Sequence, residues 1–181
     1  MNVREWLNNN SAVVTIVAVL VLCFALAFII WNNSGSGRPG PIDVYFVDLN
    51  TNEVFVGKSD QIPPIAAPSD SGDDTNGVRA HIYACGDCPS DLAGRSADEL
   101  IDGDVFIAYL ERYTDEAREI ITGDVTPENE SDYYSATEMG QLVRAVDGSN
   151  WVSINDQGGY ELMSRTGNRC GEDSMPTPCR P

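Results

Sequence analysis

The sequence predicts a small α+β domain that follows a single transmembrane helix, and three observations support this prediction. An apolar run without charge, Pro or Gly covers Ala12 to Trp31, and about 20 such residues form a helix long enough to cross a bilayer core. Residues 43–181 remain beyond it, which is enough for one ordinary domain. Strand patterns in this region occur in hairpin-like pairs around one main amphipathic helix, which favours antiparallel hairpins packed with that helix.

The N-terminal part of the chain divides into three predicted segments. Residues 1–11 form a short tail, residues 12–31 the transmembrane helix and residues 32–42 a flexible linker. Gly and Ser make the linker flexible, and its prolines prevent the helix from continuing. A cleaved signal peptide is the alternative, but its apolar core usually has about 7–15 residues. The only small-x-small triplet, at residues 25–27, lies inside the run, which favours an uncleaved signal-anchor.

Basic residues near the two ends of the run predict its orientation. Arg4 and the free N-terminus lie on one side, and Arg38 lies on the other side beyond the Gly/Ser stretch. Lys and Arg close to a span favour the cytoplasmic side. We therefore expect a single-pass protein of the cell membrane, held in the membrane by the Ala12–Trp31 helix. Its N-terminus would lie inside, and its large domain would lie outside the cytoplasm.

The charge of the chain limits its partners. The chain has 28 acidic and 11 basic residues and a formal net charge of −17. Proteins that bind nucleic acid use basic patches to neutralise phosphates, so this composition argues against nucleic acid as a partner. A protein or another envelope component remains as an expected partner of this acidic domain.

Three strands and a helix are predicted in the first part of the domain. Asp43–Leu49 and Glu53–Gly57 are rich in β-branched and aromatic residues and flank turn residues, so they predict a β-hairpin. Val78–Cys85 alternates apolar and polar residues, as a third strand with one apolar face does. Asp104–Thr122 is predicted to be the main helix, because its apolar residues recur at spacings of four and three: Phe106, Leu110, Tyr113, Ala117 and Ile120.

The rest of the domain predicts a second hairpin and a short helix. Gln141–Val146 and Trp151–Ile154 have strand composition around an Asp-Gly-Ser-Asn turn. Tyr160–Thr166 predicts a short helix that ends at Gly167.

Four cysteines of the domain form the predicted site, and they are Cys85, Cys88, Cys170 and Cys179. Cys85-Gly-Asp-Cys88 at the end of a strand resembles the knuckle of a zinc ribbon, in which a tight turn directs two thiolates at one ion. The resemblance implies that the two tail cysteines complete a structural zinc site with four cysteine ligands, although their spacing of nine positions is wider than in zinc ribbons. Such a metal would connect the C-terminal tail to the third strand.

Two other interpretations of these cysteines remain open. Exported domains commonly contain disulfides, and four cysteines allow three pairings, including cross-pairing between the Cys85–Cys88 knuckle and the tail. The knuckle also resembles the active site of thioredoxin, which implies a thiol-disulfide oxidoreductase. However, the thioredoxin motif begins a helix that lowers the first thiol's pKa, whereas Pro89-Ser90-Asp91 follows here.

Motifs of other catalytic types are absent from the sequence. His81 is the only histidine, and it lies about 13 Å along the strand from Cys85, since a strand rises about 3.3 Å per residue. We therefore expect a surface or hydrogen-bonded histidine. No nucleophile-elbow or phosphate-loop pattern occurs. The sequence thus predicts a non-enzymatic, membrane-anchored binding or scaffolding domain, although enzymatic activity is left open. A tethered oxidoreductase that uses Cys85–Cys88, or the same domain with two structural disulfides, is the alternative.

Overall fold

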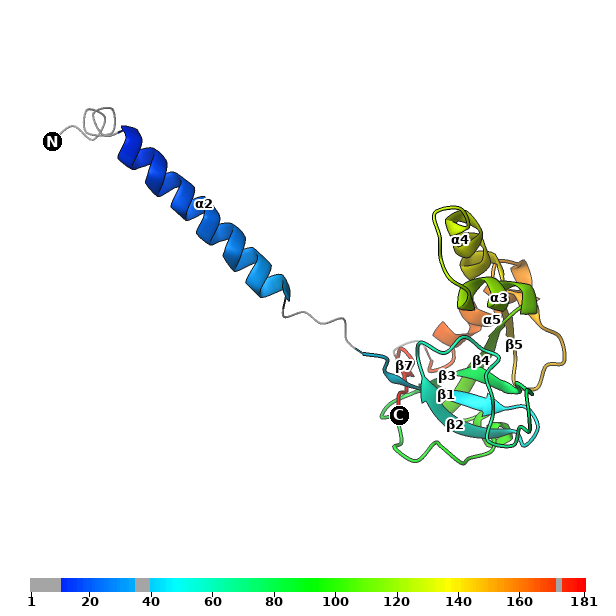
Figure 1. Cartoon of the computed structure of the whole chain (residues 1–181). Coiled ribbons are helices and arrows are strands. Elements are labelled where there is room, and N and C mark those ends of the chain that lie inside the picture. Colours follow the sequence, from blue (N-terminus) through cyan, green and yellow to red (C-terminus); the bar gives the residue numbers. More distant parts are fainter. Residues whose placement is uncertain (1–10, 35–39, 172–173) are drawn as a thin grey trace. The chain divides into compact units, whose positions relative to one another are not determined.

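The computed structural model describes residues 11–34, 40–171 and 174–181 of the chain, and it divides into two units. The first unit is Met1–Gly40 and the second is Pro41–Pro181 (Figure 1). Residues 1–10 of the predicted tail and residues 35–39 of the predicted linker lie outside the described residues.

The first unit contains one helix, α2 (Ser11–Ser34). Its apolar side chains, among them Phe24 and Phe28, are exposed in this structure. Crossing a membrane requires a helix that is both long and apolar enough, and no helix in the described part of the chain meets this requirement. This finding contradicts the predicted transmembrane helix at residues 12–31, the single-pass signal-anchor and the localisation in the cell membrane.

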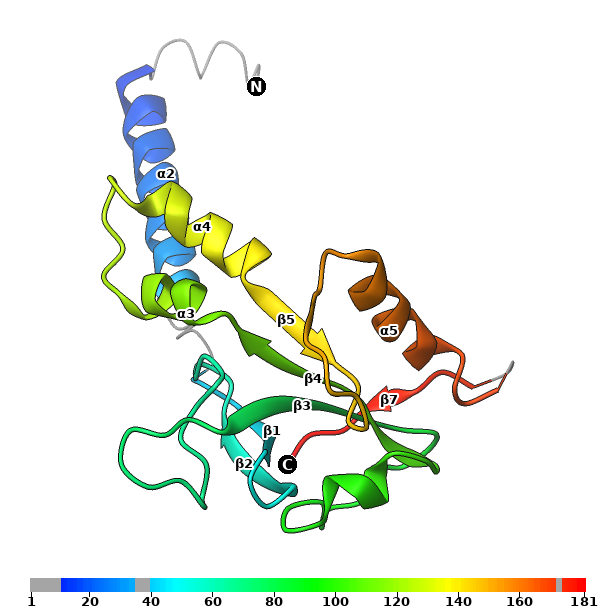
Figure 2. The same cartoon turned by 90° about the vertical axis from the view of Figure 1, so that its right-hand side faces the viewer.

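The second unit is built on an antiparallel sheet of seven strands (Figure 2). Six of the strands follow the order β2-β1-β3-β4-β5-β6, and β7 pairs with β3 beside that path. Mixed α+β architecture results from this sheet and three helices, α3 (Asp115–Thr122), α4 (Glu130–Met139) and α5 (Gln157–Gly167). The strands are β1 (Asp43–Asp48), β2 (Glu53–Lys58), β3 (Gly77–Ala84), β4 (Val105–Tyr113), β5 (Gln141–Arg144), β6 (Val152–Ser153) and β7 (Thr177–Pro178).

Both predicted hairpins are present. β1 and β2 pair from Asp43 with Lys58 to Asp48 with Glu53. Asn52 in their turn has φ of 60°, a conformation that Asn tolerates better than most residues. β5 and β6 pair over two positions, so the second hairpin is shorter than its sequence pattern predicted.

The predicted main helix at residues 104–122 is wrong, because its first half is β4 and only Asp115–Thr122 is helical. The cause is a β-bulge. Tyr109 pairs with His81 and Ile107 pairs with Ile82, which leaves Ala108 without a partner on β3. One extra residue shifts the alternation of side chains, so Ile107 and Leu110 both reach the core. Their spacing of three imitates the period of a helix.

The core fills one face of the sheet. Every second residue of β3 is buried there, and Leu92, Ala97 and Leu100 pack against this face from the segment between β3 and β4. This segment begins with Cys85 and Cys88, directly after β3. The disulfides of these two cysteines tie the start of the segment to the C-terminal tail. The opposite face of the sheet has aromatic and charged residues, which include His81 on β3 and Glu111 on β4.

Gly140 follows α4 where this helix packs against α3. A Cβ atom at Gly140 would collide with Ala117 Cβ and would lie 2.6 Å from the Ala136 carbonyl oxygen. We expect Gly140→Ala to lower the free energy of unfolding by about 1–3 kcal/mol, as overpacking does; urea unfolding measures this change. Gly158→Ala is the control, because its Cβ atom would meet Val152 at an ordinary 3.8 Å. Equal effects of the two substitutions would contradict this account of the packing.

Candidate functional site

The four predicted site cysteines form two disulfides. Cys85 pairs with Cys170 and Cys88 pairs with Cys179, with Cα–Cα distances of 5.2 and 5.5 Å. The described part of the chain contains no group of side chains that could hold a metal ion. The predicted zinc cofactor and the four-cysteine metal site are therefore wrong. The physical reason is that each thiol of the Cys85–Cys88 knuckle is used in a covalent bond to the tail, which leaves no thiolate ligands.

Backbone pairing explains why the disulfides join these partners. β7 pairs with the end of β3, so that Thr177 lies beside Ala84. The Cys179 amide donates to the Ile82 carbonyl oxygen at 2.8 Å. Gly86 turns the chain after β3 with φ of 142°, in the region that favours glycine. The tail thus follows the edge of β3, and both knuckle thiols lie against it.

This pairing bears on redox function and on the environment of the domain. A thioredoxin-like mechanism needs a reversible bridge between the two cysteines of its motif, whereas Cys85 and Cys88 belong to different bridges. The structure therefore favours the alternative of two structural disulfides. Structural disulfides persist in oxidising compartments, so the bridges point to such an environment for residues 41–181.

His81 and Glu111 form a second group of interacting polar side chains, on the sheet face opposite the core. His81 Nε2 lies 2.6 Å from Glu111 Oε2, and Arg79 Nη1 lies 3.8 Å from Glu111 Oε1. The His81 ring also stacks on Tyr109, with 4.2 Å between the ring centroids. The expected hydrogen-bonded histidine is confirmed by these contacts.

Burial and hydrogen bonding act on Glu111 in opposite directions. Burial raises the pKa of this carboxyl group, but the hydrogen bond from His81 and the charges of His81 and Arg79 lower it, and the net pKa lies below its ordinary value. Glu111 is therefore an ionised, fully paired carboxylate. Burial, with smaller contributions from Tyr83 and Glu111, raises the pKa of Tyr109 to about 12. His81 and Glu111 are paired with each other, and we assign the pair a structural role.

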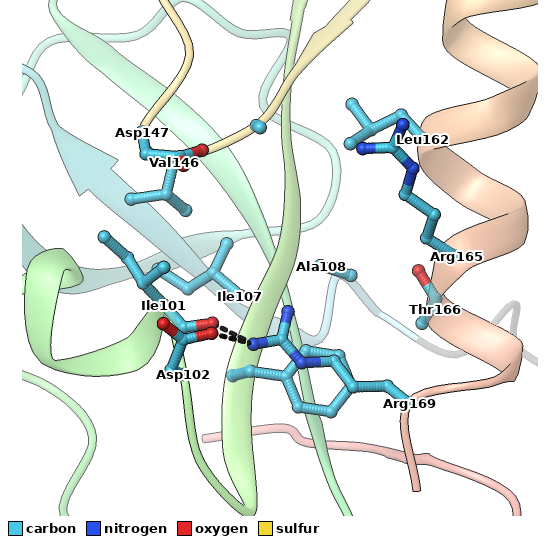
Figure 3. Close-up of a pocket in the computed structure, with 12 residues that line it drawn as sticks. Ile101, Asp102, Ile107, Ala108, Val146, Asp147, Leu162, Arg165, Thr166 and Arg169 are labelled. Atoms are coloured by element: carbon cyan, nitrogen blue, oxygen red, sulfur yellow. Dashed lines mark hydrogen bonds and ion pairs between the residues drawn. The ribbon is translucent and has the colours of Figure 1, made fainter. Parts of the chain in front are cut away.

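A cavity of about 270 Å³ lies where α5 passes β4. Its walls come from four segments that are distant in sequence: residues 101–102, residues 106–108 of β4, residues 145–147 after β5, and residues 162–169 of α5 and its C-terminal extension (Figure 3). Ala108, the bulged residue of β4, is part of the wall. The pairing of β4 with β5 ends at Leu110 and Arg144, so the chain after Arg144 separates from β4 beside this bulge.

One wall of the cavity is fixed by Arg169. Its guanidinium donates to the carbonyl oxygen of Ile101 and to Asp102 Oδ1, the latter at 2.9 Å. It also lies 4.4 Å from the centroid of the Phe106 ring. Because Cys170 is the next residue, the Cys85–Cys170 disulfide holds this arginine in place. Its charge is neutralised by Asp102.

Two polar side chains of α5 lack partners at the same cavity. Arg165 lines it and has no ion pair with any described residue. Thr166 Oγ1 is enclosed from solvent, and the described residues provide it with no hydrogen-bond partner. Buried polar atoms are nearly always hydrogen-bonded, so this hydroxyl group is an exception in the cavity wall.

Sequence reasoning missed this site. The one available signal was the pair Arg165 and Arg169, four positions apart at the end of a predicted helix in a strongly acidic chain. The other walls could not be assigned, because the bulge at Ala108 and the course of the chain after Arg144 depend on strand pairing.

Comparison with known proteins leaves the function to be argued from these sites. The chain matches no family model, and no significant match appears among the curated proteins or the solved structures.

Proposed function

We infer that residues 41–181 form a disulfide-stabilised domain of an oxidising compartment that binds a small molecule in the cavity between β4 and α5. The observation that supports this most directly is the cavity of about 270 Å³ itself, which is lined by Arg165, a cation without an ion pair among the described residues. Binding sites are typically concave and apolar with a few converging polar groups. This cavity is concave and its lining is mainly polar, with apolar surface from Ile107, Val146 and Leu162.

Binding is a better account of this chain than catalysis. His81 and Glu111 do not line this cavity, and all four cysteines of the domain are oxidised. General acid–base or nucleophilic catalysis needs a free group of this kind within reach of a substrate. The β-bulge at Ala108 also supports the cavity as the site, because bulges are frequent where a binding surface interrupts strand pairing.

A cavity-filling substitution tests this proposal. Leu162→Trp on α5 adds bulk at the cavity wall, and we expect it to weaken ligand binding at least about tenfold, the effect of losing roughly 1.4 kcal/mol of contact. The probes are acetate, succinate, glucose and leucine, each titrated into the full chain while NMR shifts of Ala108 and Val146 are followed.

Ser164→Trp is the matched control, because it puts the same side chain on an exposed part of α5 that does not line the cavity. This variant should bind as the original chain does. The proposal fails if no probe shifts the resonances of Ala108 and Val146, or if both tryptophan variants reduce binding equally.

A further inference from the structure

Two arginines of neighbouring strands lie over one tryptophan ring. The guanidinium carbon of Arg112 on β4 is 5.5 Å from the centroid of the Trp151 ring, and that of Arg144 on β5 is 4.9 Å from it. Strand β4 pairs with β5 so that Arg112 lies opposite Leu142, two positions from Arg144. The two arginines are therefore diagonal neighbours on one face of the sheet. Such neighbours lie about 7–8 Å apart, which long side chains can span, so the two guanidinium groups converge at Trp151.

The charges of these two groups are poorly neutralised, although the chain has a formal net charge of −17. Among the described residues, the one carboxylate within ion-pair distance is Asp115, whose Oδ1 lies 3.8 Å from Arg112 Nη2. The Asp115 side chain is 87% exposed, and an exposed ion pair of this kind contributes little. Arg144 has no ion pair with a described residue. Burial, and then the nearby charge of Arg112, lower the pKa of Arg144, so the fold holds two repelling cations together.

Local contacts position both side chains and leave some of their donors over. Arg112 Nε donates to the carbonyl oxygen of Tyr113 at 3.4 Å, and Arg144 Nη1 donates to that of Gly148 at 3.3 Å. A guanidinium group has five N–H donors, so each retains donors for a further acceptor. The Arg112 side chain is 27% exposed, and Arg144 and Trp151 are half-buried. An anion can therefore reach the pair from solvent, and partial burial strengthens its attraction to the two charges.

We propose that Arg112 and Arg144 form a binding site for a phosphate or sulfate group beside Trp151. An oxyanion with two negative charges matches the two guanidinium charges, and its oxygens accept paired hydrogen bonds from the planar donor edge of an arginine. A monocarboxylate has one negative charge and matches them less well. None of these three residues lines the cavity between β4 and α5, so this site does not depend on the proposed function.

Titration of the full chain with inorganic phosphate, phenyl phosphate and acetate, at an ionic strength held constant with sodium chloride, tests the site. Phosphate should shift the NMR resonances of the Trp151 indole N–H and the Arg144 amide. It should bind at least about tenfold more tightly than acetate, because a second charge-assisted hydrogen bond contributes roughly that much. Tighter binding of phenyl phosphate would identify the group as the end of a larger molecule, and equal binding would identify a free ion.

Variants of the chain assign the anion to the two arginines. Arg112→Gln and Arg144→Gln should each weaken phosphate binding about tenfold, since each removes one of the two charges. Arg165→Gln and Arg180→Gln are the matched controls, because they remove the same charge at exposed positions away from Trp151, and they should bind phosphate as the original chain does. Arg112→Gln alone carries the test if the half-buried position 144 does not accept Gln.

Urea unfolding gives a second measurement that a purely structural cluster would not change. A ligand of the folded chain stabilises it, so phosphate should raise the urea midpoint of the original chain and of both controls, but not that of the Arg112 and Arg144 variants. If phosphate raises the midpoint no more than acetate does, or if the two anions bind equally, the proposal is overturned. Loss of phosphate binding in Arg165→Gln would place the anion in the cavity instead and would also overturn it.

Discussion

Loss of both disulfides is expected to lower the free energy of unfolding by about 7 kcal/mol, which is comparable to the whole stability of an ordinary domain, about 5–15 kcal/mol. Each bridge joins cysteines that are distant in sequence, with separations of 85 and 91 residues. In the chain-entropy treatment, closing a loop of this length contributes about 4–5 kcal/mol. However, both bridges close nearly the same large loop, because their cysteines are neighbours at each end. The entropy of closing that loop therefore counts only once.

The two bridges should therefore not contribute additively. When one bridge is intact, the other closes only the short loop between neighbouring cysteines, and it contributes about 3 kcal/mol. We expect Cys88→Ala/Cys179→Ala and Cys85→Ala/Cys170→Ala each to cost about that much, and removal of the remaining bridge to cost more than removal of the first. Urea unfolding of the full chain measures all three values.

Cys23→Ala and a chelator are the controls for this experiment. Cys23 is the free cysteine of the described residues, so its replacement should leave the stability of the domain unchanged. EDTA should also have no effect, whereas a phosphine reductant should reproduce the loss seen in the fourfold variant. A chain that loses stability with EDTA and keeps it with the reductant would contradict the disulfide assignment.

Replacement of Glu111 by Ala should cost about 3 kcal/mol, the lower part of the range for breaking a buried ion pair. Its carboxylate is buried, while the side chains of His81 and Arg79 are about a quarter exposed. Water can therefore reach the two side chains that lose their partner, which limits the cost. Glu111→Gln keeps the shape of the side chain and can still accept a hydrogen bond, so we expect a smaller loss of about 1–2 kcal/mol.

The same residue should make stability depend on pH. The folded pKa of Glu111 lies below the value of 4.5 that an unperturbed glutamate has. The unfolded chain thus binds a proton at a higher pH than the folded chain does, and stability falls as the pH decreases. The contribution of Glu111 is complete above about pH 4.5 and is lost as the pH falls through the folded pKa.

Urea midpoints measured between pH 6 and 3 test this prediction. Glu111→Gln should flatten the acid side of the profile, while Glu119→Gln, on the exposed side of α3, should leave the profile as it was. Asp48 contributes in the same direction, because its hydrogen bonds with Ser69 and with the Asn50 amide lower its pKa in spite of burial. A profile of Glu111→Gln as steep as that of the original chain would contradict the assigned role of Glu111.

Local patterns in the sequence predicted the parts of the fold that depend on neighbours in the chain. The β1–β2 hairpin and β3 follow from alternation and turn residues. β4 could not be recognised, because the bulge at Ala108 brings Ile107 and Leu110 to the same face at a helical spacing. The bulge is set by pairing with β3, which no local pattern contains.

The cysteines and the cavity depended on long-range contacts in the same way. The spacing of Cys85 and Cys88 is shared by zinc knuckles, redox motifs and structural disulfides, and pairing cannot be deduced from sequence alone. The pairing of the four cysteines is decided here by the alignment of β7 with β3. The cavity needs four distant segments to meet, so only the two arginines of α5 and its extension could have pointed to it.

The edge of β3 is completed by segments from both ends of the domain. β1 pairs with Gly77–Arg79 of β3, and β7 pairs with Tyr83 and Ala84 along the same edge. An uncovered strand edge is a template for pairing with another chain and hence for aggregation. β7 has only two residues and ends in Pro178, so it covers the edge and offers little further backbone for pairing. The disulfides that hold this short strand in place therefore also protect the oxidised protein from self-association through β3.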